Sequence, residues 1–285
     1  MQDKSSTLTP EILEIVQNKG TEIPGSGKYC VIKQDGSYLC RCCGLSLFSS
    51  ETKFDSGTGW PSFDSSCSKN VMQVPDADQK RTEIVCARCY AHLGHIFKGE
   101  NFTSKNERYC VNSLSLDLVK DHNVQDTQEA IFAGGCFWGV DYLLAKIPGV
   151  LKVEVGYIGG HVANPAYKMI CQGDTGHLEA SRIIFDPQKT NFEKIAKSFF
   201  EIHDPTQKNG QGPDIGPQYQ SAIFYLDAQQ RDTALGLIEI LKSKGLDVAT
   251  QVLKATIFWP AEDYHQAYYE TKETEPYCHA YTKRF

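Results

Sequence analysis

Hydrophobic and polar positions follow one pattern over residues 28–119 and a different one over the rest of the chain. In 28–119, short apolar or alternating segments are separated by Gly, Ser, Asp and Pro. Leu114, Leu116 and Leu118 alternate with polar residues, which predicts a strand with one buried face. Because 28–119 contains no convincing amphipathic helix, we expect this half to be all-β.

The segments that flank this stretch carry helix and linker signals. Thr9 can cap a helix, Pro10 suits its first turn, and Gly20 can end it. Residues 120–128, KDHNVQDTQ, are polar and lack periodicity, as a linker would. The predicted organisation is a first domain over residues 1–120, a linker over 121–128 and a second domain over 129–285.

The second domain alternates strands with helices. One helix places apolar side chains at i, i+3, i+4, i+7 and i+8, namely Phe192, Ile195, Ala196, Phe199 and Phe200. Strands are predicted over 130–133, 150–157, 181–185, 221–226 and 248–257, and further helices over 136–146 and 228–244. The first six elements run β-α-β-β-α-β, the pattern of a ferredoxin-like core. We therefore expect an α+β domain whose fold differs from that of the first domain.

Length and composition are those of a globular protein with two domains. The chain has 285 residues, 41% hydrophobic and 22% charged, which excludes a disordered or collagen-like chain. No apolar run approaches the roughly 20 residues of a membrane span, and MQDKSSTLTP lacks the core of a signal peptide. We expect a cytoplasmic protein, unless a leader has been removed. The net charge of −6 gives no global field that would attract nucleic acid.

Eleven cysteines make the composition unusual and favour metal binding or catalysis over a disulfide framework. Two C-x-x-C segments, one with Cys40 and Cys43 and one with Cys86 and Cys89, match a closed, structural zinc site with four thiolates. Cys42 could compete with Cys40. An iron–sulfur centre, a pair of redox dithiols and a zinc ribbon that binds nucleic acid remain alternatives.

Cys110 is the first candidate nucleophile, although by itself it could be a small buried apolar residue. Arg108 and Asn112 lie two positions before and after it, and in a strand these side chains share a face. A guanidinium beside a thiol lowers the pKa of that thiol. His92 and His95 could supply a proton and orient an oxygen atom, so the segment is typical of an activated thiol with an acid partner.

Cys136 is the second candidate nucleophile. It lies in GGCFWG, where a Gly-Gly turn follows a short strand and opens a helix. A thiol in the first turn of a helix lies near the positive end of the helix dipole, which favours the thiolate. Phe137 and Trp138 could line an apolar pocket for a methyl-thioether group, although aromatic residues at a helix start often belong to the core.

Three segments of the first half, KFDSGTGWPSF, RTEIVCARCYAHLGHIF and RYCVNS, resemble the type B methionine sulfoxide reductases over about residues 8–120. The resemblance implies that Cys110 is the nucleophile and that Trp60 contacts the substrate methyl group. Its implied partners are His92, His95, Arg108 and Asn112, and its implied zinc ligands are Cys40, Cys43, Cys86 and Cys89.

The chain departs from many type B relatives at Thr58, where those relatives carry the resolving cysteine. Cys30 and Cys67 are the spare thiols of this half, and neither occupies the matching position. Either the resolving thiol lies elsewhere in the domain, or an external reductant attacks Cys110 directly.

The second half resembles the type A methionine sulfoxide reductases over about residues 129–285. The resemblance rests on GGCFWG and on NPAY, GHLEA, GPDIGPQYQS and AEDYHQ. It implies that Cys136 is the nucleophile and that Phe137 and Trp138 hold the methyl group. It further implies that Glu179 protonates the sulfoxide oxygen, helped by Tyr167, Tyr219 and Asp214. A carboxyl group in an apolar cleft has a raised pKa and can act as such an acid near neutral pH.

Two thiols of the second half lie outside these segments. Cys278 in Pro276-Tyr277-Cys278 resembles the tail in which many relatives keep a resolving cysteine, although an exposed spare thiol is the alternative. Cys171 has no assigned place, and we expect it to be a structural core thiol, with a resolving role as the alternative.

The resemblance implies a fused enzyme that reduces methionine-R-sulfoxide in the first domain and methionine-S-sulfoxide in the second. The substrate would be the free amino acid or a residue within a protein. Each nucleophile would become a sulfenic acid and then a disulfide, which thioredoxin or another external dithiol would reduce. No flavin or nicotinamide motif is present, because GGCFWG lacks the G-x-G-x-x-G turn. A thiol–disulfide oxidoreductase or chaperone is the rival class, and one domain could be a degenerate scaffold.

Overall fold

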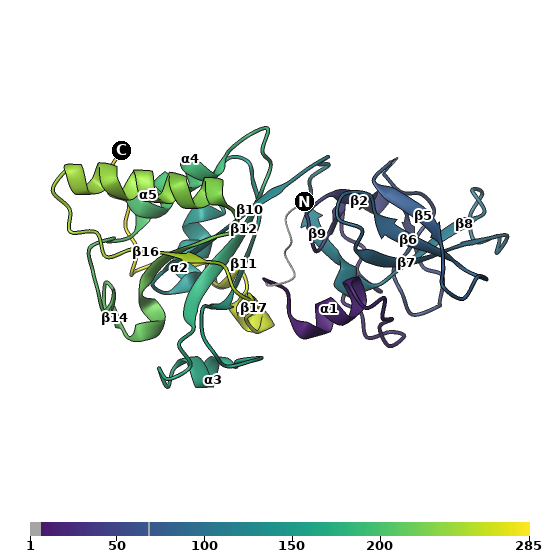
Figure 1. The fold of residues 1–285 in the computed structure, drawn as a ribbon, viewed down its shortest axis with the longest axis horizontal. Helices are drawn as coiled ribbons and strands as arrows, with labels where there is room; N and C mark the ends of the chain where they lie inside the picture. The colour runs from purple at the N-terminus through teal and green to yellow at the C-terminus, as the bar shows by residue number, and fades with distance from the viewer. Residues whose placement is uncertain (1–6, 68) are drawn as a thin grey trace. The chain divides into compact units, whose positions relative to one another are not determined.

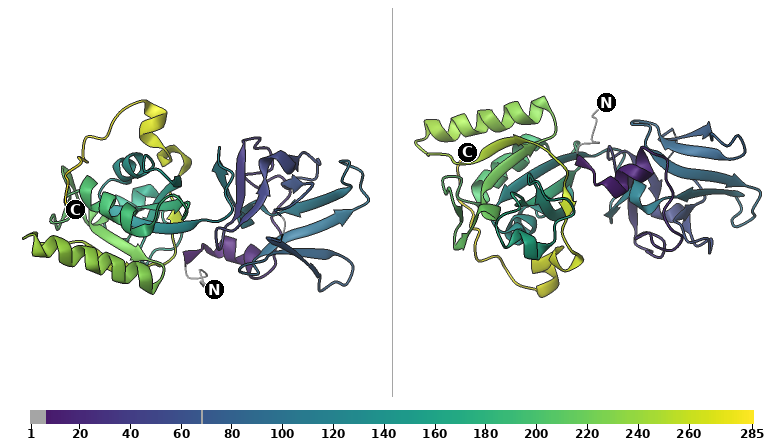
Figure 2. Two further views of the ribbon diagram at one scale, coloured as in Figure 1. Left: turned by 90° about the horizontal axis from the view of Figure 1, so that it is seen from above. Right: turned by 60° about the horizontal axis from the view of Figure 1, so that its bottom comes forward.

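The computed structural model describes residues 7–67 and 69–285. The chain falls into two compact units, Met1–Thr127 and Gln128–Phe285. Figures 1 and 2 show the elements of each unit. Within the described residues, no helix combines the length and the apolar character needed to cross a membrane.

The first unit begins with helix α1 (Pro10–Val16), where the Thr9 side chain accepts a hydrogen bond from the Ile12 amide as expected of a cap. The helix ends at Val16, before Gly20. Lys19 takes the left-handed conformation, with a φ of 58°. Gly20 is needed for a different reason, because a Cβ atom there would lie 2.9 Å from the Glu14 carbonyl oxygen.

Two antiparallel sheets form the rest of the first unit (Figure 2). The smaller sheet has the order β2 (Ser46–Ser49), β1 (Gly36–Cys40), β9 (Leu116–Lys120). The larger has the order β3 (Lys53–Phe54), β4 (Ser62–Phe63), β8 (Glu107–Val111), β7 (His92–Lys98), β6 (Thr82–Cys86), β5 (Val71–Pro75). Among the described residues of 28–119 the only helical segments are the short turns η2 (Ser50–Thr52) and η3 (Ser113–Ser115). The β-rich character of the first half is therefore confirmed.

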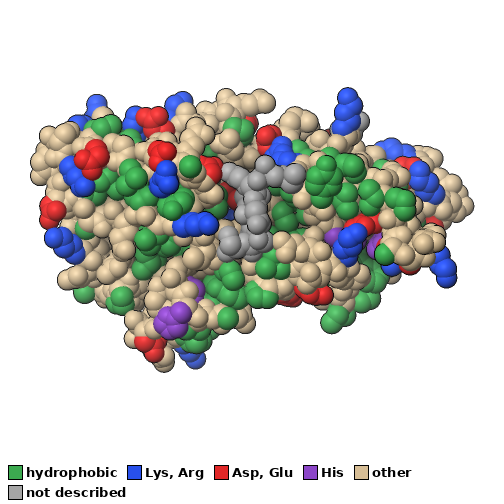
Figure 3. All heavy atoms as spheres, in the orientation of Figure 1, with side chains coloured by type: hydrophobic (Ala, Val, Ile, Leu, Met, Phe, Trp, Pro, Cys, Tyr) green, Lys and Arg blue, Asp and Glu red, His purple; other side chains and the backbone are tan. Residues whose placement is uncertain are grey.

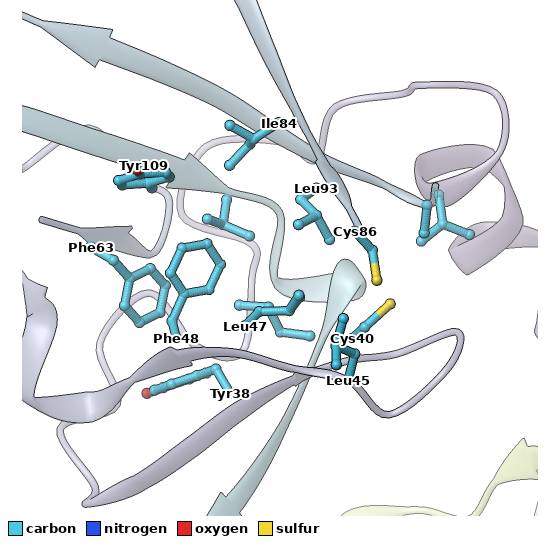
Figure 4. Packing of buried hydrophobic residues seen from close by; sticks show 14 of the residues in the cluster. Tyr38, Cys40, Leu45, Leu47, Phe48, Phe63, Ile84, Cys86, Leu93 and Tyr109 are labelled. Atoms are coloured by element: carbon cyan, nitrogen blue, oxygen red, sulfur yellow. The ribbon is translucent and has the colours of Figure 1, made fainter. Parts of the chain in front are cut away.

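Aromatic side chains fill the core of the first unit. Phe48 and Phe63 stack with their ring centroids 4.4 Å apart, and the Tyr38 ring meets Phe63 edge-on at 5.0 Å. Figure 4 shows these rings at one end of the cluster and the sulfur atoms of Cys40 and Cys86 at the other. The apolar core therefore extends directly to the two C-x-x-C segments.

The strand predicted around Leu114 differs in two respects from the expectation. Leu114 lies in the turn η3, and the strand begins at Leu116. Its polar face is also covered, because Asp117 is buried and pairs with Arg41 at 2.8 Å. The alternating pattern predicted the strand correctly, but a buried ion pair takes the place of the exposed face.

Residues 121–127 pack against the first unit. Val124 is buried, the Thr127 hydroxyl donates to the Gly44 carbonyl at 2.8 Å, and Arg88 pairs with Asp126 at 2.7 Å. These contacts explain why the boundary between the compact units follows Thr127.

The second unit is built on a six-stranded sheet with five helices. The sheet order is β16 (Gln251–Lys254), β15 (Ser221–Tyr225), β10 (Gln128–Gly134), β12 (Leu178–Phe185), β11 (Val150–Ile158), β17 (Trp259–Pro260). The helices are α2 (Phe137–Leu144), α3 (Tyr167–Ile170), α4 (Phe192–Ile202), α5 (Ala228–Ser243) and α6 (Tyr268–Lys272). Only the β15–β16 pair is parallel. The last strand predicted, over 248–257, is shorter in the structure, where it is β16. The next strand along the chain, β17, lies at the opposite edge of the sheet.

Side chains of β10 alternate between two apolar layers, as the period of a strand requires. Ala130 and Phe132 pack in one layer with residues of α2, α4 and α5, whereas Ile131 and Ala133 pack in the other. Figure 1 shows α5 beside α4. Because both faces of β10 are buried, the turn that follows it and opens α2 has a rigid base.

Candidate active sites and metal centre

Four thiols of the first unit gather at one end of its core. Cys40 Sγ lies 3.6 Å from Cys89 Sγ, and Cys43 Sγ lies 3.5 Å from Cys86 Sγ. All four sulfur atoms lie within 4.8 Å of one another. Zinc–sulfur bonds of about 2.3 Å in a tetrahedron place sulfur atoms about 3.8 Å apart. The cluster therefore has the ligands and the size of a closed zinc site.

The two C-x-x-C segments adopt the same backbone turn. The Gly44 amide donates to the Cys40 carbonyl at 2.8 Å, and the Tyr90 amide donates to the Cys86 carbonyl at 2.9 Å. Gly44 and Tyr90, each the residue after the second cysteine, both have a positive φ, 73° and 61°. Cys42 does not belong to the cluster of four, so Cys40 is the better ligand.

Cys110 lies on β8 between two neighbouring strands. His95 of β7 is its partner on one side, and Ser62 of β4 is its partner on the other. The Cβ atoms of directly opposed residues lie about 5 Å apart. The thiol therefore has an imidazole as its immediate neighbour on the same face of the sheet.

His92 and His95 come together through an irregularity in β7. Residues three positions apart in a regular strand point to opposite faces. The pairing of β6 with β7 shifts register between Ile84 and Val85, which adds one residue on the β7 side. The two imidazole rings consequently lie 5.6 Å apart.

Two carboxylates that the sequence analysis did not single out hold these imidazoles. Glu83 bonds His92 Nδ1 and Lys19 Nζ, each at 2.7 Å, and the Asp76 carboxylate bonds His95 Nε2. His92 Nε2 is buried and has no hydrogen-bond partner among the described residues. A single acidic residue in the otherwise uncharged segment 82–86 was the available signal for Glu83.

The sequence-based expectation that Arg108 makes Cys110 a thiolate is wrong for this state of the protein. Burial raises the pKa of the Cys110 thiol, and this effect exceeds the lowering by Arg108 and by a hydrogen bond with Thr58. The Arg108 guanidinium is already paired with Glu100 through bonds of 2.7 and 3.0 Å. The resting thiol is therefore protonated.

Glu22, which was also missed, connects the other predicted residues of this site. Its backbone amide donates to Asn112 Oδ1 at 3.1 Å, and its carbonyl accepts a bond of 3.2 Å from Trp60 Nε1. Its carboxylate accepts the amides of Ser113 and Leu114 at 2.7 and 2.6 Å. Asn112 follows β8 rather than lying in it, so its position depends on these bonds and not on strand periodicity.

The spare thiols of the first unit lie in different places. Cys30 Sγ lies 3.0 Å from the carbonyl oxygen of Gly59, the residue after Thr58. Cys67 Sγ lies 3.7 Å from the Ser46 hydroxyl, on β2 in the other sheet. Because Thr58 contacts the Cys110 thiol, Cys30 is the spare thiol whose contacts lead to that site.

In the second unit, Cys136 occupies the N-cap position of α2, directly after a Gly135 with a φ of 93°, and its side chain makes no capping hydrogen bond. Cys278 comes from the C-terminal tail, yet it is buried. The thiols of Cys136 and Cys278 and the Asp214 carboxylate lie within 4.8 Å of one another. The structure therefore brings together three predicted site residues that are far apart in the sequence.

The expectation of a resting thiolate at Cys136 is also wrong for this state. The neighbouring Cys278 thiol and burial raise the pKa of Cys136, and they outweigh the lowering by the Trp138 backbone amide. A helix terminus acts over only one turn, whereas burial and the neighbouring sulfur act directly on the Cys136 thiol.

Glu179 lies on β12 and is buried, and its Oε2 atom accepts the Phe137 amide at 3.2 Å. Burial raises the pKa of Glu179 well above its usual range, and a negative charge on Cys136 would raise it further. Burial is the largest cause that raises the pKa of the Tyr219 and Tyr167 hydroxyls. The site thus places a carboxyl group with a raised pKa beside two phenols.

Aromatic rings gather around Phe137 and Trp138, the two residues that follow Cys136. Trp138 stacks on Tyr268 with ring centroids 3.7 Å apart and donates through Nε1 to His265 Nδ1 at 3.2 Å. The His265 ring lies 5.2 Å from the Phe137 ring and 4.5 Å from the Tyr167 ring. His265 was not given a role, although the AEDYHQ segment that contains it was the available signal.

Cys171 is exposed, so the expectation of a core thiol is wrong. It follows the short helix α3, and its backbone amide donates to the Tyr167 carbonyl at 3.0 Å. Met169 and Gln172 beside it are exposed as well, so the end of this helix of four residues faces solvent.

Comparisons with known proteins agree with this division of the chain. A family model described as "Peptide methionine sulfoxide reductase" matches residues 128–285, and one described as "SelR domain" matches residues 8–120. Curated relatives are peptide methionine sulfoxide reductases MsrA. The protein from Nautilia profundicola is 48% identical over 150 residues, which are 53% of this chain and 87% of the relative. The protein from Deinococcus radiodurans is 44% identical over 172 residues, 57% and 84% of the two chains.

The crystal structure of Mxr1 from Saccharomyces cerevisiae in reduced form is similar in fold, with a TM-score of 0.52 and 30% sequence identity. The match covers 56% of this chain and 93% of Mxr1. The chain therefore belongs to the peptide methionine sulfoxide reductase family, in which it joins a SelR domain to an MsrA-type domain and reduces methionine sulfoxide of both stereospecificities.

Proposed function

We propose that Cys110 reduces methionine-R-sulfoxide in the first domain and that Cys136 reduces methionine-S-sulfoxide in the second. In each, the thiol sulfur attacks the sulfoxide sulfur while an acid protonates the oxygen. Methionine then leaves and the cysteine becomes a sulfenic acid. The observation that carries this proposal is the presence of two separate thiols, each beside its own proton-donating groups.

In the second domain, Glu179 is the proposed acid, with Tyr167 and Tyr219 as hydrogen-bond donors to the oxygen. Its raised pKa keeps the proton available near neutral pH. Phe137 and Trp138 would hold the methyl group in the aromatic surroundings described above. Asp214 lies beside both thiols.

In the first domain, His92 and His95 are the proposed donor and orienting groups. His92 Nε2 has no partner among the described residues and is available to a substrate oxygen. Trp60 would contact the methyl group, Asn112 would position the oxygen, and Arg108 would support the thiolate as Cys110 reacts.

Cys278 is the proposed resolving thiol of the second domain, because it is buried beside Cys136. For the first domain we propose Cys30, because its thiol bonds the Gly59 carbonyl while Thr58 contacts Cys110. Cys67 faces β2 and is the weaker candidate. In each domain a second thiol would convert the sulfenic acid to a disulfide with loss of water.

A structural zinc ion is the proposed occupant of the cluster of Cys40, Cys43, Cys86 and Cys89. Four thiolates leave no open position, so the ion would join the two C-x-x-C turns and take no part in the reaction. We further propose thioredoxin or a similar external dithiol as the electron donor, and no flavin or nicotinamide cofactor.

We propose domains over 1–120 and 129–285 with a linker between them, and a cytoplasmic enzyme acting on free or protein-bound sulfoxide. The antiparallel order β15-β10-β12-β11 supports a ferredoxin-like core in the second domain. In Figure 3 Lys and Arg side chains alternate with Asp and Glu, unlike the basic surface of a nucleic-acid-binding protein.

The test uses each sulfoxide epimer separately with the whole chain and a dithiol reductant. C110S should lose only R-epimer reduction, and C136S should lose only S-epimer reduction. Loss of both activities in either variant would contradict the two-site proposal. Insulin reduction without sulfoxide reduction would instead favour a general thiol–disulfide oxidoreductase.

A further inference from the structure

His279, the residue after Cys278, uses both of its ring nitrogens. It is buried, with 8% of its surface exposed. Nε2 lies 2.7 Å from the Gly134 carbonyl oxygen, and Nδ1 lies 3.1 Å from Cys278 Sγ. One ring therefore links the proposed resolving thiol to the turn that carries Cys136.

These two contacts fix where the protons lie. A carbonyl oxygen can only accept a hydrogen bond, so Nε2 carries the ring proton. Burial lowers the pKa of His279, which keeps the ring neutral and leaves a lone pair on Nδ1. The Cys278 thiol accordingly donates its proton toward Nδ1, in the arrangement of a nucleophile and its base.

Gly139 of α2 provides the space for this ring. A Cβ atom at Gly139 would lie 2.2 Å from His279 Nδ1 and 2.9 Å from the neighbouring ring carbon. The imidazole therefore packs directly against the backbone of the helix that Cys136 begins. This packing and the bond to Gly134 hold the base in place relative to both thiols.

The charged and titratable neighbours favour proton transfer to this ring. Asp214 lies within 4.8 Å of both thiol sulfurs, and its negative charge opposes a thiolate there. The same charge stabilises a protonated imidazole, because it acts to raise the pKa of His279. A base that accepts the Cys278 proton would thus offset the repulsion that Asp214 creates.

We propose that His279 is the general base that deprotonates Cys278 when the Cys136–Cys278 disulfide forms. This inference rests on the proposed resolving role of Cys278. The Cys278 proton moves to His279 Nδ1, and Cys278 Sγ attacks the sulfenic sulfur of Cys136. The S–O bond breaks, and hydroxide takes a proton from the imidazolium and leaves as water. The sulfenic sulfur is reduced and the thiol sulfur is oxidised, so no further oxidant is needed.

The test compares the whole wild-type chain with H279Q, because a Gln amide can still donate to the Gly134 carbonyl but offers no basic nitrogen to Cys278. Methionine-S-sulfoxide is added in one equivalent without reductant. The sulfenic acid is trapped and the disulfide is counted by mass spectrometry over time. We expect the sulfenic acid to accumulate in H279Q and the disulfide to form about a hundredfold more slowly at neutral pH.

The pH profile separates a base from a structural residue. In H279Q the rate of disulfide formation should rise about tenfold per pH unit as the thiol itself ionises. In the wild type the rate should level off above the pKa of the imidazole. An H279Q rate equal to that of the wild type, or a rate that is lowered equally at every pH, would overturn the proposal.

Two further variants complete the design. His177 is a buried histidine of the same unit whose ring bonds the Gly160 amide and the Val162 carbonyl. H177Q should keep the wild-type pH profile, and a profile like that of H279Q would overturn a specific role of His279. C278S should form no disulfide. If C278S still forms one, the resolving role of Cys278 fails independently of His279.

Discussion

The imidazole rings of His92 and His95 lie 5.6 Å apart on one face of β7, although their spacing in a regular strand would place them on opposite faces. The register shift between β6 and β7 accounts for this. Glu83 and Asp76 then hold the two rings from outside the motif. The first active site therefore depends on a local irregularity and on two carboxylates.

Removing the Glu83 carboxylate should impair the first site. Glu83 is buried and bonds both His92 and Lys19. E83A leaves the buried His92 Nδ1 without its partner, so we expect the free energy of unfolding of the first unit to fall by about 1–3 kcal/mol. R-epimer kcat/KM should fall at least tenfold while S-epimer kcat/KM is unchanged. If E83A and the wild type had the same R-epimer kcat/KM, Glu83 would not position His92.

Metal analysis should find one zinc ion per chain, and removing it should affect only the first unit. The four thiolates join the turns after β1 and β6, so a strong chelator or C43S should unfold this region. R-epimer activity should then be lost and S-epimer activity retained. C42S is the matched control, because Cys42 lies outside the cluster. A folded, fully active chain without metal would contradict a structural zinc site.

The resolving thiol of the first domain can be identified with two matched variants. C30S should lose turnover with thioredoxin at the R epimer but still release about one methionine per chain, because Cys110 reacts before any second thiol is needed. C67S should turn over normally, since Cys67 lies against Ser46 of β2. The measurement is R-epimer turnover with peptide mapping of disulfides. The opposite pattern would assign the role to Cys67.

The S-epimer reaction should depend on a protonated Glu179. Burial raises the pKa of this carboxyl group, so its acid form persists above the ordinary carboxyl range. S-epimer kcat/KM should therefore decline as the pH rises through this raised pKa. The S-epimer kcat/KM of E179Q should be at least a hundredfold lower than that of the wild type, and it should no longer decline as the pH rises. An alkaline decline of the same shape in E179Q would assign it to another group.

Asp141 on α2 should make the stability of the second unit depend on pH. Burial and the charge of Glu270 raise its pKa to about 7, from a model-compound value of 3.8. A carboxyl group with a raised folded pKa stabilises the protein below its unfolded pKa, and this contribution is lost as the pH rises toward 7.

D141N keeps an acceptor for the Ala267 amide and removes the ionisation. It should match the wild type near pH 4 and exceed its free energy of unfolding at pH 8 by up to about 4 kcal/mol. Thermal unfolding of the second unit as a function of pH is the measurement. Parallel curves for the two proteins would show that Asp141 stays ionised throughout.

Several elements could be predicted because their cause is local. Thr9 caps α1, the apolar spacing from Phe192 to Phe200 forms α4, and each C-x-x-C segment forms its own tight turn. The end of α1 was harder to predict from the sequence, because the left-handed residue that follows the helix is Lys19 and not Gly20. The exposed position of Cys171 likewise depends on what packs against α3.

The protonation of the nucleophiles could not be predicted from their neighbours in sequence. Arg108 near Cys110 and the helix start at Cys136 both suggested thiolates. Burial opposes this at each site, Glu100 already pairs with Arg108, and Cys278 lies beside Cys136. Desolvation depends on everything packed around a group, which two flanking residues do not reveal.

The sequence by itself determined the division into a β-rich half and an α/β half, the family that each half resembles and the sulfoxide-reducing chemistry, because backbone periodicity and side-chain type act at short range. Only the tertiary structure decided which groups meet: Glu83 with His92, Glu22 with Asn112, and His279 with Cys278. Glu22 and Asn112 are 90 residues apart in the chain, whereas the other two pairs are close in sequence and meet only because of how their segments fold. All three depend on how strands register and how the tail packs, and these are set by the whole folded chain.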